Sequence, residues 1–284
     1  LIQKLEQKKG PCHWRITAEV RVIEPRIAFR LICVLTFGAM VSGCGGGGGS
    51  TSTPGSPLIY TLAEAQLPAK WTVLVYLDAD NDLEEAAVRN FNQMEAAGST
   101  RDVHVIVQMD RKTGHGLNGP SWTDTRRYLI IRDSDTRIMR SIRLDVPQLG
   151  ELDMGNPNTL RDFVEWGKRE FPADHYLLVV WDHGSGWHFR TLKPTPRYKA
   201  IACDDTSHSK MDVTGMASAL SGLKVDVIAL DACYMQQLEV AYELRDCADY
   251  LVASAATEPS PGYDYQRLLT RVNGTTTPLQ MCQT

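Results

Sequence analysis

From residue 68 onward, short apolar runs alternate with segments whose apolar residues recur at helical spacing. The runs predict strands at 71–77, 103–109, 176–181, 225–231 and 250–254, and the intervening segments predict helices at 83–97, 158–170, 213–220 and 234–244. An apolar run without alternation is typical of a strand buried on both faces, as in a parallel sheet covered by helices. The pattern therefore predicts an α/β domain whose mostly parallel sheet lies between two helical layers.

Two shorter runs, 128–131 and 138–144, interrupt this alternation. Between them lie Asp133, Ser134 and Asp135, which favour a turn. We expect a hairpin or an excursion at the edge of the sheet.

Composition excludes some classes of function. A hydrophobic content of 43% suits an ordinary globular core, and a net charge of −4 gives no basic surface for nucleic acid. Seven cysteines without a CxxC pair make neither a disulfide scaffold nor a zinc motif. We expect no nucleic-acid partner and a monomer.

The first part of the chain has the pattern of an export signal. Arg26 and Arg30 precede a short apolar stretch at 31–41, which is too short to span a bilayer comfortably. The Val-Ser-Gly that follows, with Cys44 directly after it, resembles the lipobox of bacterial lipoproteins, in which the cysteine is lipidated. An ordinary signal peptide cut nearby is the alternative.

These features divide the chain into three regions. Residues 1–43 are expected to be a non-structural extension with a lipoprotein signal peptide, and 44–67 a lipidated cysteine with a Gly/Ser/Pro tether that cannot form a core. The domain is expected at 68–284. The predicted location is the membrane-anchored outer side of a bacterial cell, at the surface or in the periplasm.

Two of the predicted strands stop at a reactive side chain, His183 and Cys233. Neighbouring parallel strands would bring this imidazole and thiol to one sheet edge, where open α/β sheets form their sites. The helix expected from Tyr234 would favour the thiolate, and the main-chain N–H groups of Gly184 and Cys233 could form an oxyanion hole. The alternative is that Cys233 is a buried small side chain and His183 is a loop histidine without a catalytic role. The pairing favours a cysteine hydrolase.

At these positions the chain resembles a known family. The segments WDHGSGW at 181–187 and DACYM at 231–235 are similar to the clostripain family of cysteine peptidases, peptidase family C11. The similarity extends over residues 71–77, 80–84, 204–207, 241–244 and 257–259. It implies a caspase-like three-layer α/β/α sandwich, a catalytic dyad of His183 and Cys233, and cleavage after Arg or Lys. Because the resembled enzymes continue well beyond Thr284, the domain is expected to be incomplete at its C-terminus.

A basic P1 side chain, the substrate residue before the cleaved bond, needs a buried carboxylate. By the resemblance, Asp231 is the candidate for this S1 pocket, and its alternative role is to cap the helix from Tyr234. Asp264 is a weaker second candidate, because residues 260–265 depart from the family pattern.

The resemblance also implies cleavage into two chains between the His and Cys strands. The segment 190–199 is basic and rich in proline, as expected of an exposed loop. Autocleavage is predicted at Lys199–Ala200 and Arg197–Tyr198. An unprocessed, solvated loop is the alternative.

Residues 78–82 begin like a calcium loop, but Leu83 and Arg89 stand where an EF-hand needs Gly and Glu. No metal site is assigned and no cofactor is required. Asp80 and Asp82 remain weak Ca²⁺ candidates, since calcium dependence occurs in the resembled family, while helix capping is the alternative.

Two other signals are discounted. Ser185 lacks a GxSxG elbow, because His183 stands where that motif needs glycine. His188, Cys203 and His208 do not have the spacing of a zinc motif.

The sequence thus predicts a lipid-anchored cysteine endopeptidase acting on peptides or proteins with a basic P1 residue. The rival is a catalytically inactive caspase-fold surface lipoprotein that serves as a binding module.

Overall fold

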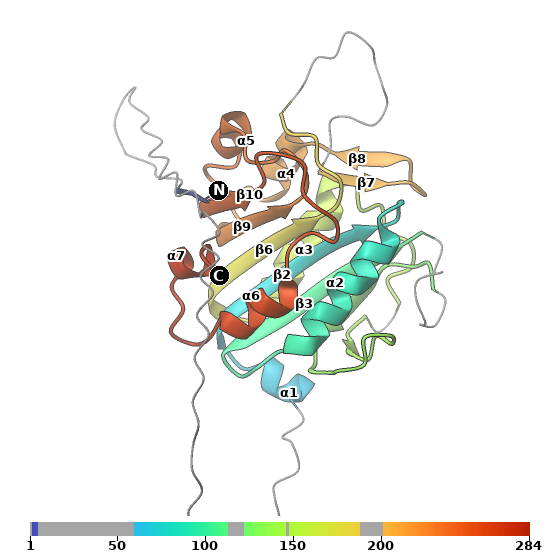
Figure 1. The fold of residues 1–284 in the computed structure, drawn as a ribbon, viewed down its shortest axis with the longest axis vertical. Coiled ribbons are helices and arrows are strands. Elements are labelled where there is room, and N and C mark those ends of the chain that lie inside the picture. Colours follow the sequence, from blue (N-terminus) through green and yellow to red (C-terminus); the bar gives the residue numbers. More distant parts are fainter. Residues whose placement is uncertain (1, 5–59, 113–121, 146–147, 188–200) are drawn as a thin grey trace, which may run out of the picture. The chain divides into compact units, whose positions relative to one another are not determined.

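The computed structural model describes residues 2–4, 60–112, 122–145, 148–187 and 201–284. In this part of the chain an eight-stranded sheet has the order β1-β10-β9-β6-β2-β3-β4-β5 (Figure 1). Its strands are β1 (Ile2–Lys4), β2 (Ala69–Ala79), β3 (Val103–Arg111), β4 (Arg126–Leu129), β5 (Ile142–Arg143), β6 (Ala173–Trp181), β9 (Val225–Asp231) and β10 (Ala248–Ala253). The five strands from β10 to β3 are parallel, and β1, β4 and β5 are antiparallel additions at the edges. The predicted mostly parallel sheet is confirmed.

Helices cover both faces of the sheet, as the uninterrupted apolar strands require. One face packs against α2 (Glu84–Ala97), α6 (Tyr265–Arg271) and α7 (Pro278–Met281). The other packs against α3 (Pro157–Glu170), α4 (Val213–Ala219) and α5 (Leu238–Glu243). A short α1 (Leu62–Ala65) precedes β2, and a separate hairpin of β7 (Ala202–Asp204) and β8 (Ser209–Met211) follows β6. In Figure 1, α2 and α6 lie in front of the sheet and α3 lies behind it.

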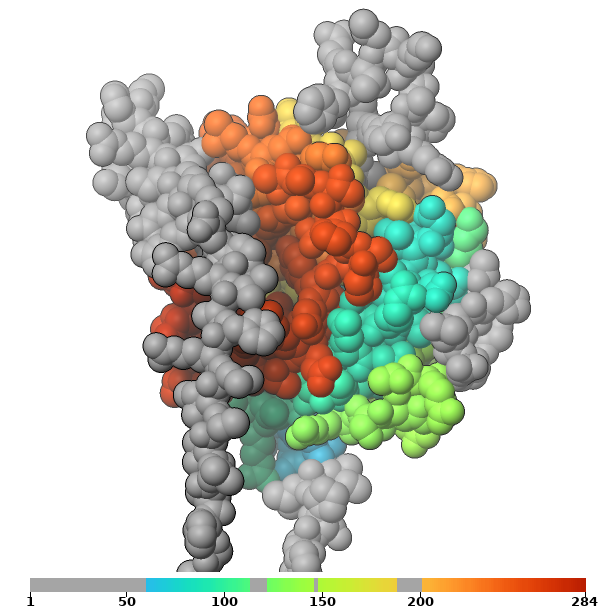
Figure 2. Space-filling view, viewed as in Figure 1, coloured from blue at the N-terminus to red at the C-terminus, as the bar shows by residue number. Residues whose placement is uncertain are grey.

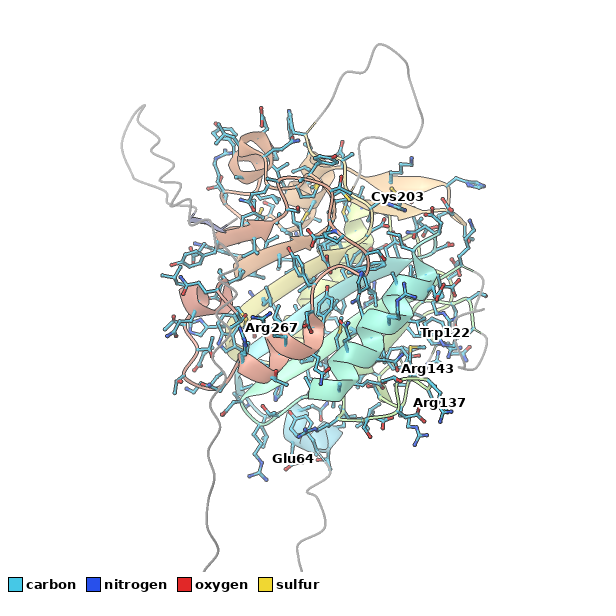
Figure 3. All side chains as sticks on the ribbon, in the orientation of Figure 1. Glu64, Trp122, Arg137, Arg143, Cys203 and Arg267 are labelled. Atoms are coloured by element: carbon cyan, nitrogen blue, oxygen red, sulfur yellow. The ribbon has the colours of Figure 1, made fainter. Side chains whose placement is uncertain are left out.

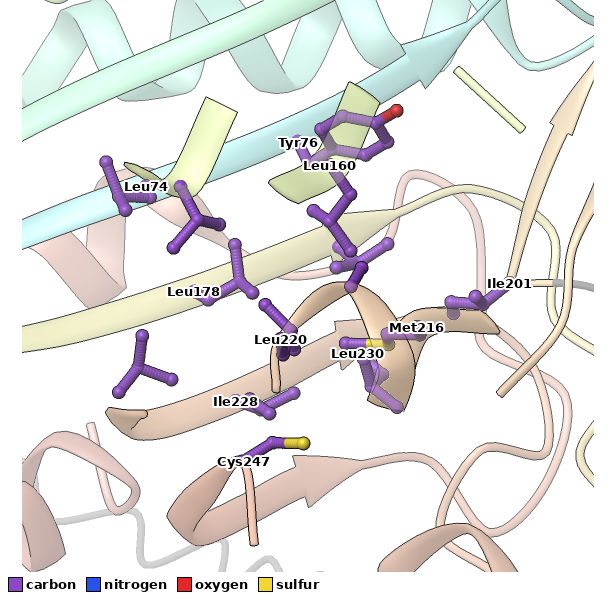
Figure 4. Close-up of a cluster of buried hydrophobic side chains, with 14 of the residues drawn as sticks. Leu74, Tyr76, Leu160, Leu178, Ile201, Met216, Leu220, Ile228, Leu230 and Cys247 are labelled. Atoms are coloured by element: carbon purple, nitrogen blue, oxygen red, sulfur yellow. The ribbon is translucent and has the colours of Figure 1, made fainter. Parts of the chain in front are cut away.

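The core is divided between the two faces by the alternation of side chains along each strand. On β2, Leu74 and Tyr76 belong to the cluster shared with α3 and α4, which Figure 4 draws, whereas Val73 and Val75 belong to the cluster under α2. Cys247 lies in the first cluster and behaves as a small hydrophobic residue, since burial raises the pKa of its thiol to about 11. Burial on both faces explains why the strand patterns lack alternation.

The helix expected from Tyr234 starts later than predicted, because α5 begins at Leu238. The main-chain N–H groups of Tyr234 and Gln236 donate to the carbonyls of Ala256 and Ser254 at 2.9 and 2.8 Å. Tyr234 also has a φ of +61°, outside the helical region. The prediction that Cys233 lies at a helix N-terminus is therefore wrong, since Cys233 lies in a turn five residues before the helix.

The excursion expected after β3 is an antiparallel pairing of β4 with β5, as predicted. β5 is shorter than the predicted run 138–144 because the main-chain N–H groups of Arg140 and Ser141 donate to the buried carboxylate of Glu95 at 2.7 and 2.8 Å. These bonds hold the first half of the run away from the ladder.

Three residues depart from the expectation that 1–43 has no structure. β1 pairs antiparallel with β10, with Ile2 opposite Val252. An extended backbone can pair with an open sheet edge whatever its side chains. The rest of 1–43 lies outside the described residues.

Within the described ranges, none of the helices combines the length and the apolar character needed to cross a bilayer.

Candidate active site

His183 and Cys233 follow neighbouring parallel strands. β6 pairs with β9 in a register that places Trp181 opposite Asp231. Extended by two residues, this register places His183 opposite Cys233 at the carboxyl edge of the sheet. The neighbourhood on which the cysteine hydrolase hypothesis depends is present.

Gly184 brings the two loops into direct contact. A Cβ on Gly184 would lie 2.4 Å from the carbonyl oxygen of Cys233 and 2.8 Å from its nitrogen, so only glycine fits. Among the described residues, no acceptor pairs with the main-chain N–H of Gly184 or of Cys233. Both predicted oxyanion donors thus lie side by side with their N–H groups available.

The thiol of Cys233 is held from a segment that follows β10. The main-chain N–H of Glu258 donates to Sγ of Cys233 at 3.3 Å, and the Tyr234 hydroxyl lies 2.8 Å from the Thr257 hydroxyl. A charge-stabilising N–H at the sulfur replaces the helix N-terminus that the sequence predicted. Residues 257–259, Thr-Glu-Pro, contributed to the family resemblance, but the sequence analysis gave them no role.

His183 has an acidic partner that the sequence analysis named only as a weak Ca²⁺ candidate. Its Nε2 lies 2.7 Å from Oδ1 of Asp82, whose exposed side chain follows β2. Asn81 links the same two loops, since its amide donates to the buried carboxylate of Asp182 at 2.8 Å. The sequence signals for the pair are the family resemblance at 80–84 and a strand expected to end at Leu77, five residues before Asp82.

A pocket of about 220 Å³ opens between these loops, α2 and the segment 258–262. It is lined by Leu83, Ala86, Trp181, Asp182, His183, Asp231, Ala232, Cys233, Glu258, Pro259, Ser260, Pro261 and Gly262. In the space-filling view, α2 lies beside the chain that leads into α6 (Figure 2). The predicted reactive side chains and the predicted S1 carboxylate share this pocket.

Asp231 is 3% exposed, and its carboxylate is only half satisfied. Oδ2 accepts from the Tyr263 main-chain N–H at 3.1 Å and from the Tyr265 hydroxyl at 2.8 Å, whereas Oδ1 has no partner among the described residues. Burial raises the pKa of Asp231 to about 7. Its contacts are not those of a cap for the helix after Cys233, so that alternative role is wrong.

Gly262 packs against this carboxylate. Its φ of +88° is a conformation that favours glycine, and a Cβ would lie 2.7 Å from both Asp231 oxygens. The carboxylate therefore fits its place only because residue 262 has no side chain.

Asp264, the weaker S1 candidate, does not line the pocket. Its side chain accepts from the main-chain N–H of Arg267 at 3.0 Å and caps α6. Asp264 is therefore not part of the proposal below.

The remaining residues singled out from the sequence either lie outside the described residues or take no part in a metal-ligating cluster there. Cys44, Arg197, Lys199 and His188 lie outside the described residues. Cys203, labelled on the β7–β8 hairpin in Figure 3, donates its main-chain N–H to Asp182, and burial raises the pKa of its thiol to about 12. Within the described part of the chain, neither Cys203 nor His208 joins a cluster of metal-ligating side chains.

The model of the clostripain family matches residues 75–282. This chain belongs to the clostripain family. Clostripain from Hathewaya histolytica is 29% identical over 228 residues, which are 72% of this chain and 42% of clostripain. The chain thus spans less than half the length of this curated relative.

Solved clostripain-family structures have a similar fold. A secreted C11 cysteine protease from Bacteroides thetaiotaomicron, in complex with an irreversible peptide inhibitor, is 26% identical at a TM-score of 0.60, over 76% of this chain and 57% of that one. An inactive zymogen C11 protease from Parabacteroides distasonis is 27% identical at a TM-score of 0.55, over 72% and 53%. The predicted caspase-like α/β sandwich is confirmed.

Proposed function

We propose that this clostripain-family chain is a cysteine endopeptidase that cleaves peptide bonds after Arg or Lys. The observation that carries the proposal is the shared pocket, in which a thiol, an imidazole and a half-satisfied buried carboxylate lie at one sheet edge. The supporting comparison is the family itself, whose relatives are described as cysteine proteases.

In the proposed reaction, Sγ of Cys233 gives its proton to His183 and attacks the scissile carbonyl carbon. The oxyanion that forms would accept hydrogen bonds from the N–H groups of Gly184 and Cys233. The C–N bond then breaks as the leaving amine takes the proton from His183, which leaves a thioester on Cys233. Water, deprotonated by His183, hydrolyses the thioester and regenerates the thiol.

The partner of His183 assigns its two ring nitrogens. Because Nε2 contacts Asp82, Nδ1 is the nitrogen left for proton transfer to and from substrate. We propose Asp82 as a positioning residue that fixes this orientation.

Asp231 would determine the substrate preference. An arginine or lysine side chain entering the pocket would supply the cation that Oδ1 lacks, so charge pairing would occur in a site shielded from water. The same buried carboxylate would disfavour an acidic P1 residue.

A peptidyl-arginine chloromethyl ketone tests the proposal directly. We expect it to label the parent at Cys233, with no label on Cys233→Ala and much slower labelling by a matched peptide with P1 norleucine. No labelling of the parent would favour the inactive surface-binding rival, and equal labelling by both peptides would refute the basic preference.

We further propose autocleavage at Arg197–Tyr198 or Lys199–Ala200, between β6 and β7. Support comes from the basic residues there and from the relative described as an inactive zymogen. The parent should convert into two bands on a denaturing gel, and Cys233→Ala should remain one. Nicking of the alanine variant at the parental rate would attribute the cleavage to another protease.

We also propose that Cys44 carries a lipid that anchors the exported protein. The lipobox-like sequence supports the anchor, and the secreted relative supports export. Radioactive palmitate fed to the expressing bacterium should label the parent but not Cys44→Ser. Equal labelling of the two would refute the anchor.

A further inference from the structure

Tyr234 combines a strained backbone with an exposed aromatic ring directly after Cys233. Its φ of +61° is a left-handed conformation that is rare for a bulky residue, and the residue is 43% exposed. Glycine or asparagine would adopt this conformation at lower cost. Because Tyr234 belongs to neither core cluster of the described residues, packing does not account for an aromatic side chain here. Strain of this kind beside a reactive group points to a function of the ring.

Two hydrogen bonds hold the ring of Tyr234 in place. Its main-chain N–H donates to the carbonyl of Ala256 at 2.9 Å, and its hydroxyl lies 2.8 Å from the hydroxyl of Thr257. The hydroxyl is therefore engaged, and what the ring offers to a ligand is its apolar face. Since the ring is already tied at both ends, a ligand that packs on it loses little entropy in ordering it.

The strand order places this ring across Cys233 from His183. β9 lies between β6 and β10, as Figure 1 shows, and the residues that Tyr234 contacts belong to the segment that follows β10. His183 follows β6 on the other side. The nucleophile thus lies between the imidazole and the exposed ring.

This arrangement orients a substrate in the proposed reaction. His183 gives its proton to the leaving amine, so the residues after the cleaved bond extend toward β6 and those before it extend toward β10. The P1 side chain enters the pocket that contains Asp231, which Tyr234 does not line. Successive side chains of an extended peptide point in opposite directions, so the P2 side chain turns away from that pocket and toward the turn that carries Tyr234.

We propose that Tyr234 determines specificity at P2, and that its ring binds a large apolar P2 side chain such as leucine. Packing leucine on the ring face removes apolar area of both groups from water, whereas alanine would cover less of the ring. This role rests on the proposed endopeptidase function and adds a second substrate position to it. The preferred substrates would carry an apolar residue followed by a basic one before the cleaved bond.

Tyr234→Asn tests this role, because asparagine removes the ring and tolerates a positive φ. Two peptides with P1 Arg should be compared that differ only in Leu or Ala at P2. The parent should have a kcat/KM about tenfold higher for Leu, a preference that should nearly vanish in Tyr234→Asn. Tyr234→Phe, which keeps the ring, should retain most of the preference. Tyr242→Ala is the matched control, since Tyr242 is a similarly exposed tyrosine on α5, and it should behave as the parent does.

A purely structural role of Tyr234 would lower all rates together. We expect instead that Tyr234→Asn hydrolyses the P2 Ala peptide at close to the parental rate. Its preference for P1 Arg over P1 norleucine should also be unchanged, because the pocket around Asp231 does not include the ring.

Equal kcat/KM values for the two peptides in the parent, or an unchanged preference in Tyr234→Asn, would overturn the role of Tyr234. Failure of the parent to hydrolyse any peptide with P1 Arg would instead contradict the proposed function. In that case, binding of the same peptides to Cys233→Ala, measured by fluorescence anisotropy, decides about Tyr234 separately. The P2 Leu peptide should bind about tenfold more tightly than the P2 Ala peptide, and equal affinities would again overturn the role.

Discussion

Nε2 of His183 lies 2.7 Å from Oδ1 of Asp82, and the contact joins the loops that follow β6 and β2. The strand order reverses between these two strands, since β3 lies on one side of β2 and β6 on the other. Such a reversal is where open α/β sheets form their crevices. Both side chains are well exposed, at 44% and 70%, so the pair adds little to stability.

Asp82→Ala should therefore impair activity and leave the fold intact. We expect kcat on an arginyl peptide to fall about tenfold or more with KM little changed, because the imidazole loses its orientation. Asp82→Asn should recover part of the rate, since an amide oxygen still accepts from Nε2–H. Glu85→Ala, another exposed acid nearby, is the control, and an equal loss in that variant would contradict the positioning role.

Asp231→Asn should remove the preference for basic residues. The loss of a buried charge pairing predicts a fall of about 100-fold in kcat/KM for P1 Arg or Lys. Hydrolysis of a matched P1 norleucine peptide should change little. A similar fall for both peptides would mean that Asp231 stabilises the turn that carries Cys233 and does not bind the P1 side chain.

The preference itself should depend on pH. Because the pKa of Asp231 is raised to about 7, its charge is present above pH 7 and is lost as pH falls below that value. The ratio of kcat/KM for P1 Arg to that for P1 norleucine should therefore decline from pH 8 to pH 6, and using the ratio cancels the titration of the reacting groups. In Asp231→Asn the ratio should be flat over this range.

The same substitution should stabilise the protein at neutral and higher pH. The unfolded chain releases the Asp231 proton near 3.8 and the native protein near 7, so each rise in pH between these values reduces native stability. Asn removes that cost and can still accept from Tyr263 and Tyr265. The difference in melting temperature, variant minus parent, should grow from pH 4 to pH 7 and then level off. A constant difference would contradict the raised pKa.

Gly262→Ala should lose cleavage after Arg and Lys, since its Cβ would lie 2.7 Å from both Asp231 oxygens. Gly222 is a matched control, because it has a φ of +78° and a Cβ added there would meet nothing within 4 Å. Gly222→Ala should destabilise the fold by about 1–2 kcal/mol through backbone strain alone and keep the substrate preference. Retained preference in Gly262→Ala would show that the carboxylate can move.

The strands were predictable because the sheet is buried on both faces. Residues such as Leu74 and Val75 point to opposite cores, so the pattern of the run identifies a covered strand without any knowledge of its neighbours. The start of α5 was not predictable from local pattern. The N–H of Tyr234 and the carbonyl of Ala256, which keep that segment out of a helix, are 22 residues apart and paired only by the fold.

In the site too, residues marked by a local sequence pattern could be located, whereas residues placed by long-range contacts could not. His183, Cys233 and Asp231 could be located from sequence because each ends or directly follows an apolar strand, and the resemblance supplied their expected roles. Glu258 and Gly262 could not, since their contacts with Cys233 and Asp231 depend on how a loop after β10 returns to the sheet edge. Asp82 was named only as a weak Ca²⁺ candidate or a helix cap, because the role of an acidic residue in the sequence 78–82 depends on which loop it faces.

That returning loop has a consequence for synthesis. A ribosome makes His183 and Cys233 before it makes residues 258–265, which complete the pocket and hold Asp231. A chain made only as far as Cys233 holds both side chains but lacks residues 258–262, which line the pocket beside them. During translation the proposed reactive pair is therefore made before the segment that completes the pocket around it.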